Sequence, residues 1–177
     1  MPGGRGGARE PTVGENDEKM LEAVAAELQE LRALLQQPKV AEQLSSALLA
    51  KLSAKSSSRD RVQAAKVASV LLEVGEPLRA GSIFQALLEL EPDEPYYRLG
   101  RAQAHLKAGE PQAAAMRFDE VLKHEPELVE AYVGRGEALL AQGRTSEALR
   151  DFERVVELDP QSTFAQLALV LLGQHPR

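Results

Sequence analysis

The sequence predicts an all-α protein whose central part is one helical unit written three times. Pro92, Pro126 and Pro160 lie 34 residues apart. A fixed step in this range is typical of repeat proteins, whose units stack side by side. A glycine, an alanine, a phenylalanine and a small residue recur at the same step. These columns are Gly75, Gly109 and Gly143; Ala80, Ala114 and Ala148; Phe84, Phe118 and Phe152; and Ala68, Ala102 and Gly136.

The spacing inside each unit predicts two helices joined by a tight turn. In the third copy, residues 130–142 and 146–158 both carry apolar residues at helical intervals. Gly143 lies between them, where a chain that leaves a helix needs a positive φ. Alanine and leucine dominate the composition, and both favour helix. Each copy is therefore predicted to be a helix, a turn and a second helix, closed by proline.

The third copy, from Tyr132 to Pro160, closely resembles the tetratricopeptide repeat (TPR) family. That motif has a small residue at position 8, glycine at 15, alanine at 20, an aromatic at 24 and proline at 32. The third copy has Gly136, Gly143, Ala148, Phe152 and Pro160 there. The resemblance implies a TPR α-solenoid, a right-handed superhelix of antiparallel helix pairs. Position 7, often leucine in the family, is arginine in the second and third copies.

The regions outside the repeats are predicted to be a tail and flanking helices. Residues 1–14 are rich in glycine and almost free of apolar side chains, which predicts a disordered tail. Residues 161–177 contain a short apolar helix at the place of a fourth unit, where an array needs a cap. The predicted boundaries are 1–14 for the tail, 15–58 for N-terminal helices, 59–160 for the repeats (61–94, 95–128 and 129–162), and 161–177 for the capping helix and tail.

The first N-terminal helix carries a narrow coiled-coil seam in steps of 3, 4, 3 and 4 residues. Two interpretations stay open: the seam packs on the protein's own repeats, or it forms a homodimer with a second copy. Pro38 ends this helix, and a second one is expected to pack in front of the first repeat, with Ser58 or Asp60 starting the repeat helix. The seam residues are Leu21, Val24, Leu28, Leu31 and Leu35.

Composition and motifs argue against catalysis. The absence of cysteine excludes disulfides and thiolate chemistry, and it predicts a cytoplasmic protein. His105, His124 and His175 lie on separate elements, so we expect no metal, no cofactor and no enzyme activity. Residues 61–160 carry 18 acidic and 12 basic side chains, which disfavours nucleic-acid binding. No apolar stretch approaches the length needed for membrane insertion.

The family resemblance implies a ligand surface on the first helix of each repeat, at positions 2, 5, 9, 12 and 13. The lining is largely apolar, with Phe164 and Leu167 continuing the row. Family members that hold acidic chaperone C-termini use lysine at position 5 and asparagine at position 9, and this chain has neither. The predicted groove residues are Val62, Ala65, Ser69, Leu72, Tyr96, Leu99, Gln103, Leu106, Lys107, Glu130, Val133, Glu137 and Leu140.

Function is therefore predicted to be protein–protein interaction, by an adaptor that binds a partner's segment through spaced hydrophobic anchors. A second interpretation comes from residues 83–103, which are similar to the junction of the first two repeats in type III secretion chaperones for hydrophobic translocators. The alanine, leucine and arginine bias is associated with GC-rich bacterial genomes. A third interpretation is a structural subunit that assembles with itself.

Overall fold

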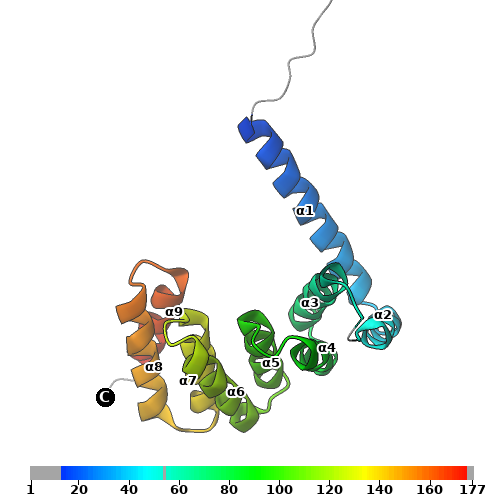
Figure 1. The fold of residues 1–177 in the computed structure, drawn as a ribbon. Coiled ribbons are helices and arrows are strands. Elements are labelled where there is room, and N and C mark those ends of the chain that lie inside the picture. Colours follow the sequence, from blue (N-terminus) through cyan, green and yellow to red (C-terminus); the bar gives the residue numbers. More distant parts are fainter. Residues whose placement is uncertain (1–12, 54, 175–177) are drawn as a thin grey trace, which may run out of the picture.

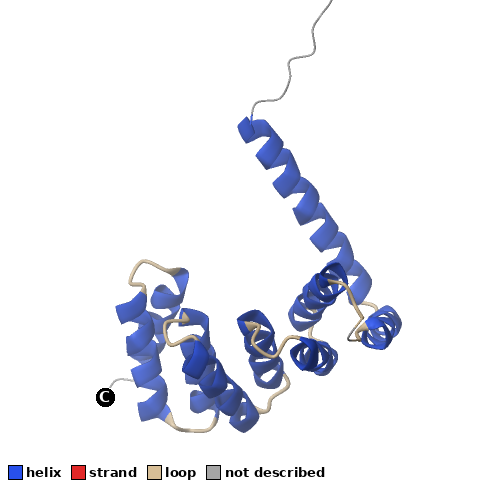
Figure 2. Ribbon diagram, viewed as in Figure 1, coloured by secondary structure: helices blue, strands red, loops and turns tan. Residues whose placement is uncertain are grey.

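The computed structural model describes residues 13–53 and 55–174, with side chains described from Asp17 onward. All regular structure within these residues is helical (Figure 2). The helices are α1 (Val13–Leu35), α2 (Pro38–Lys51), α3 (Ser58–Glu73), α4 (Pro77–Leu90), α5 (Pro95–Lys107), α6 (Pro111–His124), α7 (Val129–Ala141), α8 (Thr145–Leu158) and α9 (Thr163–Gln174).

Helices α3 to α8 form three successive pairs that stack on one another. Each helix packs on the one before it and the one after it, and α3, α5, α7 and α9 also contact one another in turn. Figure 1 shows the pairs following an arc, with α1 projecting away from it. The predicted all-α solenoid is confirmed.

The turns inside the pairs have the predicted chemistry. Gly75, Gly109 and Gly143 have φ of 85°, 75° and 74°, a region where a side chain is strained. Pro77 and Pro111 stand in the first turn of α4 and α6, where the missing amide hydrogen has no partner to lose.

The first repeat helix begins at Ser58, one of the two starts that the sequence predicts. Ser57 precedes it as the N-cap of α3, and Asp60 is the third residue of the helix. The Ser57 hydroxyl accepts from the Asp60 amide at 3.2 Å, and the Asp60 carboxylate accepts from the Ser57 amide at 3.1 Å. This reciprocal arrangement is a capping box, and it satisfies two amides that would otherwise lack partners.

The phenylalanine column forms the centre of the core. Phe84, Phe118 and Phe152 are buried, with exposed fractions of 1%, 0% and 0%. The rings of Phe84 and Phe118 lie against Gly100 and Gly134 of the next repeat, where an added Cβ would overlap them. These two glycines thus allow α4 and α6 to approach the following first helices closely, whereas Phe152 lies against Gly136 of its own pair.

The N-terminal helices pack on the first repeat. α1 contacts α3, and α2 contacts α4. Leu35 and Ala41 are buried in the first core cluster, which also contains Leu71 and Phe84. Helix α1 begins at Val13, earlier than the predicted boundary at 15, and the rest of the predicted tail lies outside the described residues.

The C-terminal helix α9 covers the last pair with only one side. Ala165 and Ala168 are buried in the third core cluster, which also contains Phe152 and Val155. Leu167, Leu169 and Val170 are exposed on the remaining surface. His175 lies outside the described residues.

Candidate functional site

The first helices of the pairs enclose a recess of about 450 Å³, here called the central groove. α3, α5 and α7 supply most of its wall, and α6 and α9 contribute one phenylalanine each. Its lining residues are Ser69, Leu72, Glu73, Tyr96, Gln103, Leu106, Lys107, Phe118, Glu130, Val133, Gly134, Glu137 and Phe164.

A second recess of about 570 Å³, here called the side hollow, lies between α1, α3 and the start of α5. It shares Ser69, Glu73 and Tyr96 with the central groove, so the two recesses are neighbours. Its lining residues are Leu28, Val62, Ala65, Lys66, Ser69, Val70, Glu73, Glu94, Tyr96 and Tyr97.

Tyr96 stands where the two recesses meet. It is 49% exposed, its hydroxyl lies 2.5 Å from the Ser69 hydroxyl, and its ring meets Phe84 edge to face at 6.2 Å. These contacts from α3 and α4 orient an aromatic side chain that is still accessible. A side chain of this kind, apolar in body and polar at its tip, suits a binding surface.

The predicted groove residues do not form one continuous row. Val62 and Ala65 line the side hollow, and Ser69 and Tyr96 line both recesses. Leu72, Gln103, Leu106, Lys107, Glu130, Val133 and Glu137 line the central groove.

Leu99 and Leu140 line neither recess. Leu99 packs against the second core cluster, which contains Phe118 and Val121, and Leu140 packs against the third. Both side chains remain partly exposed, so their contact with a ligand stays a prediction.

Several lining residues were missed by the sequence prediction. Phe118 and Gly134 belong to the repeat columns and their packing partners, and they form the back of the groove wall, where the ring is fully buried against the glycine. Leu28 enters the side hollow from α1. No repeat pattern could indicate this contact, because α1 lies outside the repeats.

The two recesses differ in how their charges are matched. Glu73 forms an ion pair with Arg32 of α1, and Lys66 binds Glu27 of α1 at 2.8 Å. In the central groove, Lys107, Glu130 and Glu137 have no hydrogen bond or ion pair with any residue of the described chain. α1 thus pairs with Glu73 and Lys66, and it leaves Lys107, Glu130 and Glu137 of the central groove without an ion pair.

The pKa of Glu137 is shifted by the groove walls, although part of its side chain reaches solvent. Desolvation by the groove walls raises the pKa of its carboxyl group above the usual value, and the Lys107 ammonium group only partly opposes this.

The second half of the α1 seam packs on the first repeat, and its first half is exposed. Leu35 is buried, and Leu28 and Leu31 pack against the core of the first repeat. Leu21 and Val24 are 66% and 45% exposed. The seam as a whole is therefore not available to a second copy, and only its first half stands free of the repeats (Figure 1).

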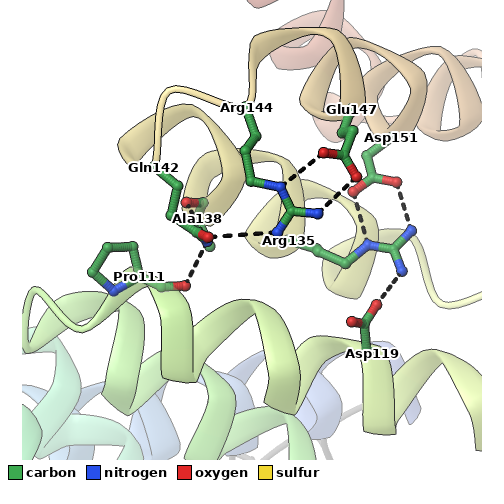
Figure 3. A network of polar contacts seen from close by, with 8 residues as sticks. All are labelled: Pro111, Asp119, Arg135, Ala138, Gln142, Arg144, Glu147 and Asp151. Carbon is green, nitrogen blue, oxygen red and sulfur yellow. Dashed lines mark hydrogen bonds and ion pairs between the residues drawn. The ribbon is translucent and has the colours of Figure 1, made fainter.

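A polar cluster lies between α6, α7 and α8, apart from the groove. Arg135 donates to Asp151 at 2.8 and 2.6 Å and to Asp119 at 2.5 Å, while Arg144 pairs with Glu147 at 2.7 Å (Figure 3). Hydrogen bonds to Asp151 contribute most to raising the pKa of Arg135. Arg135, the arginine at position 7 of the third repeat, thus connects α7 to α6 and α8 by ion pairs.

The described residues show no metal-ligand constellation. No group of three or more histidine or carboxylate side chains within them is arranged to hold a metal ion. His105 instead lies 2.6 Å from Glu110 through its Nδ1 atom. None of the described helices combines the length and the apolar character that a bilayer crossing requires.

Stacked helix pairs with a recess along their first helices define a helical-repeat solenoid. A sequence profile described as tetratricopeptide repeat matches residues 68–118 and 99–163, which together span more than half of the chain. The chain therefore belongs to the tetratricopeptide repeat family. A search of curated proteins found no match.

Solved structures share the fold at low sequence identity. The second TPR domain of human RPAP3, in complex with an HSP70 peptide, is 21% identical with a TM-score of 0.57, over 64% of this chain and 96% of that one. The Yersinia enterocolitica type III secretion translocator chaperone SycD is 22% identical with a TM-score of 0.60, over 66% and 89%. A MamA RS-1 ArsTM double mutant is 18% identical with a TM-score of 0.60, over 85% and 84%.

Proposed function

We propose that this chain is a non-catalytic interaction module that binds a peptide segment of a partner protein in the central groove. The observation that carries the proposal is the groove itself, an open recess to which α3, α5, α7 and α9 all contribute apolar side chains. An open recess of this shape suits a segment with spaced hydrophobic anchors. We place this interaction in the cytoplasm, on the grounds of the cysteine-free sequence.

Two of the similar structures support a binding role. The RPAP3 domain is described in complex with an HSP70 peptide, and SycD is described as a translocator chaperone. Both are peptide or protein binders by these descriptions, and they share the arrangement of stacked helix pairs. The groove of this chain lacks the lysine and asparagine pattern of the carboxylate-binding members, so we expect a different class of peptide.

The chemistry of the wall indicates where binding energy would come from. Tyr96 is half exposed, while Leu106 and Phe164 are partly buried. Their apolar surfaces are therefore accessible to a ligand, and packing against the core restricts their motion. A ligand that covers them gains apolar burial, and it loses the freedom of a flexible chain. We expect micromolar affinity or somewhat tighter.

The test uses short random peptides displayed on phage and selected on the immobilised full-length protein. Selected peptides should carry spaced apolar residues, and Tyr96→Ala should weaken their binding about tenfold or more, because aromatic anchors near the centre of a site contribute most. Met116→Ala is the matched control, since Met116 is 61% exposed and lines neither recess. Equal binding by wild type and Tyr96→Ala would place the ligand on another surface.

Self-association is a second candidate function, favoured by the projecting half of α1. Met20, Leu21 and Val24 are all exposed there, and an apolar stripe of this kind on a free helix favours pairing. The translocator-chaperone interpretation is a finer form of the main proposal and would combine this helix with the apolar groove.

Light scattering on the double variant Leu21→Glu/Val24→Glu separates these possibilities. A dimer should become a monomer without loss of helical circular dichroism, because both side chains are exposed. Deleting the whole helix is a poor test, since Leu28, Leu31 and Leu35 pack against the first repeat. A wild-type protein that is monomeric at high concentration would remove this candidate.

A further inference from the structure

Two carboxylates stand in the central groove without partners. Glu130 and Glu137 both lie on α7, seven residues apart, which places them about two helical turns apart on the same side of the helix. Neither makes a hydrogen bond or an ion pair with the described part of the chain. The one cation on this wall, Lys107, likewise has no ion pair.

Other carboxylates around the two recesses are already engaged. Glu73 is paired with Arg32, and the Glu94 side chain accepts from the Tyr96 amide at 3.4 Å at the start of α5. The unmatched negative charge is therefore concentrated on α7, beside the apolar surfaces of Leu106 and Phe164.

An unpaired carboxylate beside apolar walls is a suitable place for a cation. The walls remove part of its water and supply no hydrogen bond in return, and Lys107 offsets this only in part, which is also why the pKa of Glu137 is raised. A lysine or arginine side chain from a ligand would provide the missing donor, and hydrogen bonds between charged groups are stronger than neutral ones.

We propose that the ligand of the central groove is a basic, apolar segment. Its apolar side chains cover Leu72, Tyr96, Leu106 and Phe164, and a lysine or arginine between them binds Glu137, with Glu130 within reach of a second basic residue. This inference rests on the proposed function. It assigns to the groove a ligand charge opposite to that of acidic C-terminal peptides, whose carboxylates the two glutamates would repel.

The same charges argue against one other occupant, the α1 helix of a second copy. The exposed first half of α1 carries Asp17, Glu18 and Glu22 next to its apolar stripe, with Lys19 as the only basic side chain described there. An acidic helix would bring like charges to Glu130 and Glu137. A heterologous basic segment satisfies them.

The experiment selects random displayed peptides in parallel on the full-length wild type, on Glu130→Gln/Glu137→Gln and on Tyr96→Ala. The wild-type pool should be enriched in apolar residues and in lysine or arginine, compared with the unselected library. The double glutamine variant should keep the apolar preference and lose the basic enrichment. Circular dichroism confirms that each variant is folded.

Synthetic peptides from the wild-type pool then measure the contact directly by fluorescence anisotropy. Replacing the basic residue by glutamine should weaken binding about tenfold, equivalent to about 1.4 kcal/mol. Glu137→Gln should cause a similar loss with the basic peptide and almost none with the glutamine peptide, which is the signature of a direct pair. Added salt should weaken the basic peptide more than the glutamine peptide.

The outcomes distinguish this inference from the proposed function. A wild-type pool that is apolar but not basic, or is acidic, overturns the inference and leaves the groove as the binding site. A pool in which the basic residue is insensitive to both glutamine substitutions overturns it as well. If no peptide is selected, or if Tyr96→Ala selects and binds the same peptides equally well, the proposed function fails and the inference fails with it.

Discussion

Two charged residues on α7, only two positions apart, differ in their ion pairing. Arg135 points toward α6 and α8 and is held by Asp119 and Asp151 (Figure 3). Glu137 faces the central groove and has no ion pair with the described residues. One helix therefore carries a charge that is satisfied within the fold and a charge that is not.

This difference separates residues that stabilise the repeats from residues that are free to bind. Side chains between the helices should affect unfolding when they are changed and have little direct effect on ligand binding. Side chains of the groove should do the reverse. The three predictions below test that separation, from the largest expected effect to the smallest.

Phe118→Ala should lower the free energy of unfolding by about 3 to 5 kcal/mol, because it removes a fully buried ring and leaves a cavity beside Gly134. Denaturant melts followed by circular dichroism provide the measurement. Met116→Ala on the same helix is the control, and it should change stability little since Met116 is exposed. A loss below about 1 kcal/mol for Phe118→Ala would show that the phenylalanine column is not core.

Arg135→Gln should destabilise the fold by about 2 to 3 kcal/mol, because the Asp151 side chain is only 7% exposed and would lose its partner. The matched control is Arg144→Gln in the same cluster. Both partners in the Arg144–Glu147 pair are 48% exposed, so the loss there should stay below about 1 kcal/mol. Equal effects in urea melts would contradict the distinction between the two arginines.

Glu137→Gln should raise stability slightly near neutral pH. The folded-state pKa of Glu137 is raised, so its contribution is fully favourable only below the unfolded value of about 4.5 and is lost as the pH rises through the folded value. The gain of the variant over wild type should therefore be present near neutral pH and disappear in acid. Lys107 on α5 opposes the shift, and Glu130 on α7 is the other carboxylate of this wall.

Glu147→Gln is the control of opposite sign for the same melts. A hydrogen bond from Arg144 lowers the pKa of Glu147, so its contribution is present above the ordinary pKa and is lost in acid. This substitution should not stabilise the protein at neutral pH. If Glu137→Gln destabilised the fold near neutral pH, Glu137 would have a structural partner, and the comparison with Arg135 would fail.

The repeat columns were predictable because they follow from local backbone requirements and from one periodic contact. Gly143 is required by a positive φ, and Pro111 starts α6 where an amide hydrogen is dispensable. Phe118 repeats because every second helix meets the next unit in the same way. Such requirements recur with each copy, so a single sequence displays them.

The candidate site was predictable only in part. Tyr96 and Leu106 line the recess, since the first helix of each pair contributes to it, and their role in binding stays a prediction. Leu99 lies one turn away on α5 and packs against the second core cluster without lining the recess. Motif positions specify which helix is involved but not its rotation to within one residue.

By itself, the sequence determined the helix pairs, their period, the buried phenylalanine column and the absence of thiol chemistry. The tertiary structure alone decided how the charges are distributed. It paired Arg135 with Asp119 and Asp151 across three helices, and it brought Arg32 of α1 to Glu73, while Glu137 was left unmatched. Helix formation depends on residues that are close together in the sequence, so it can be predicted from the sequence alone. Ion pairing between helices depends on approach and rotation, which only packing determines.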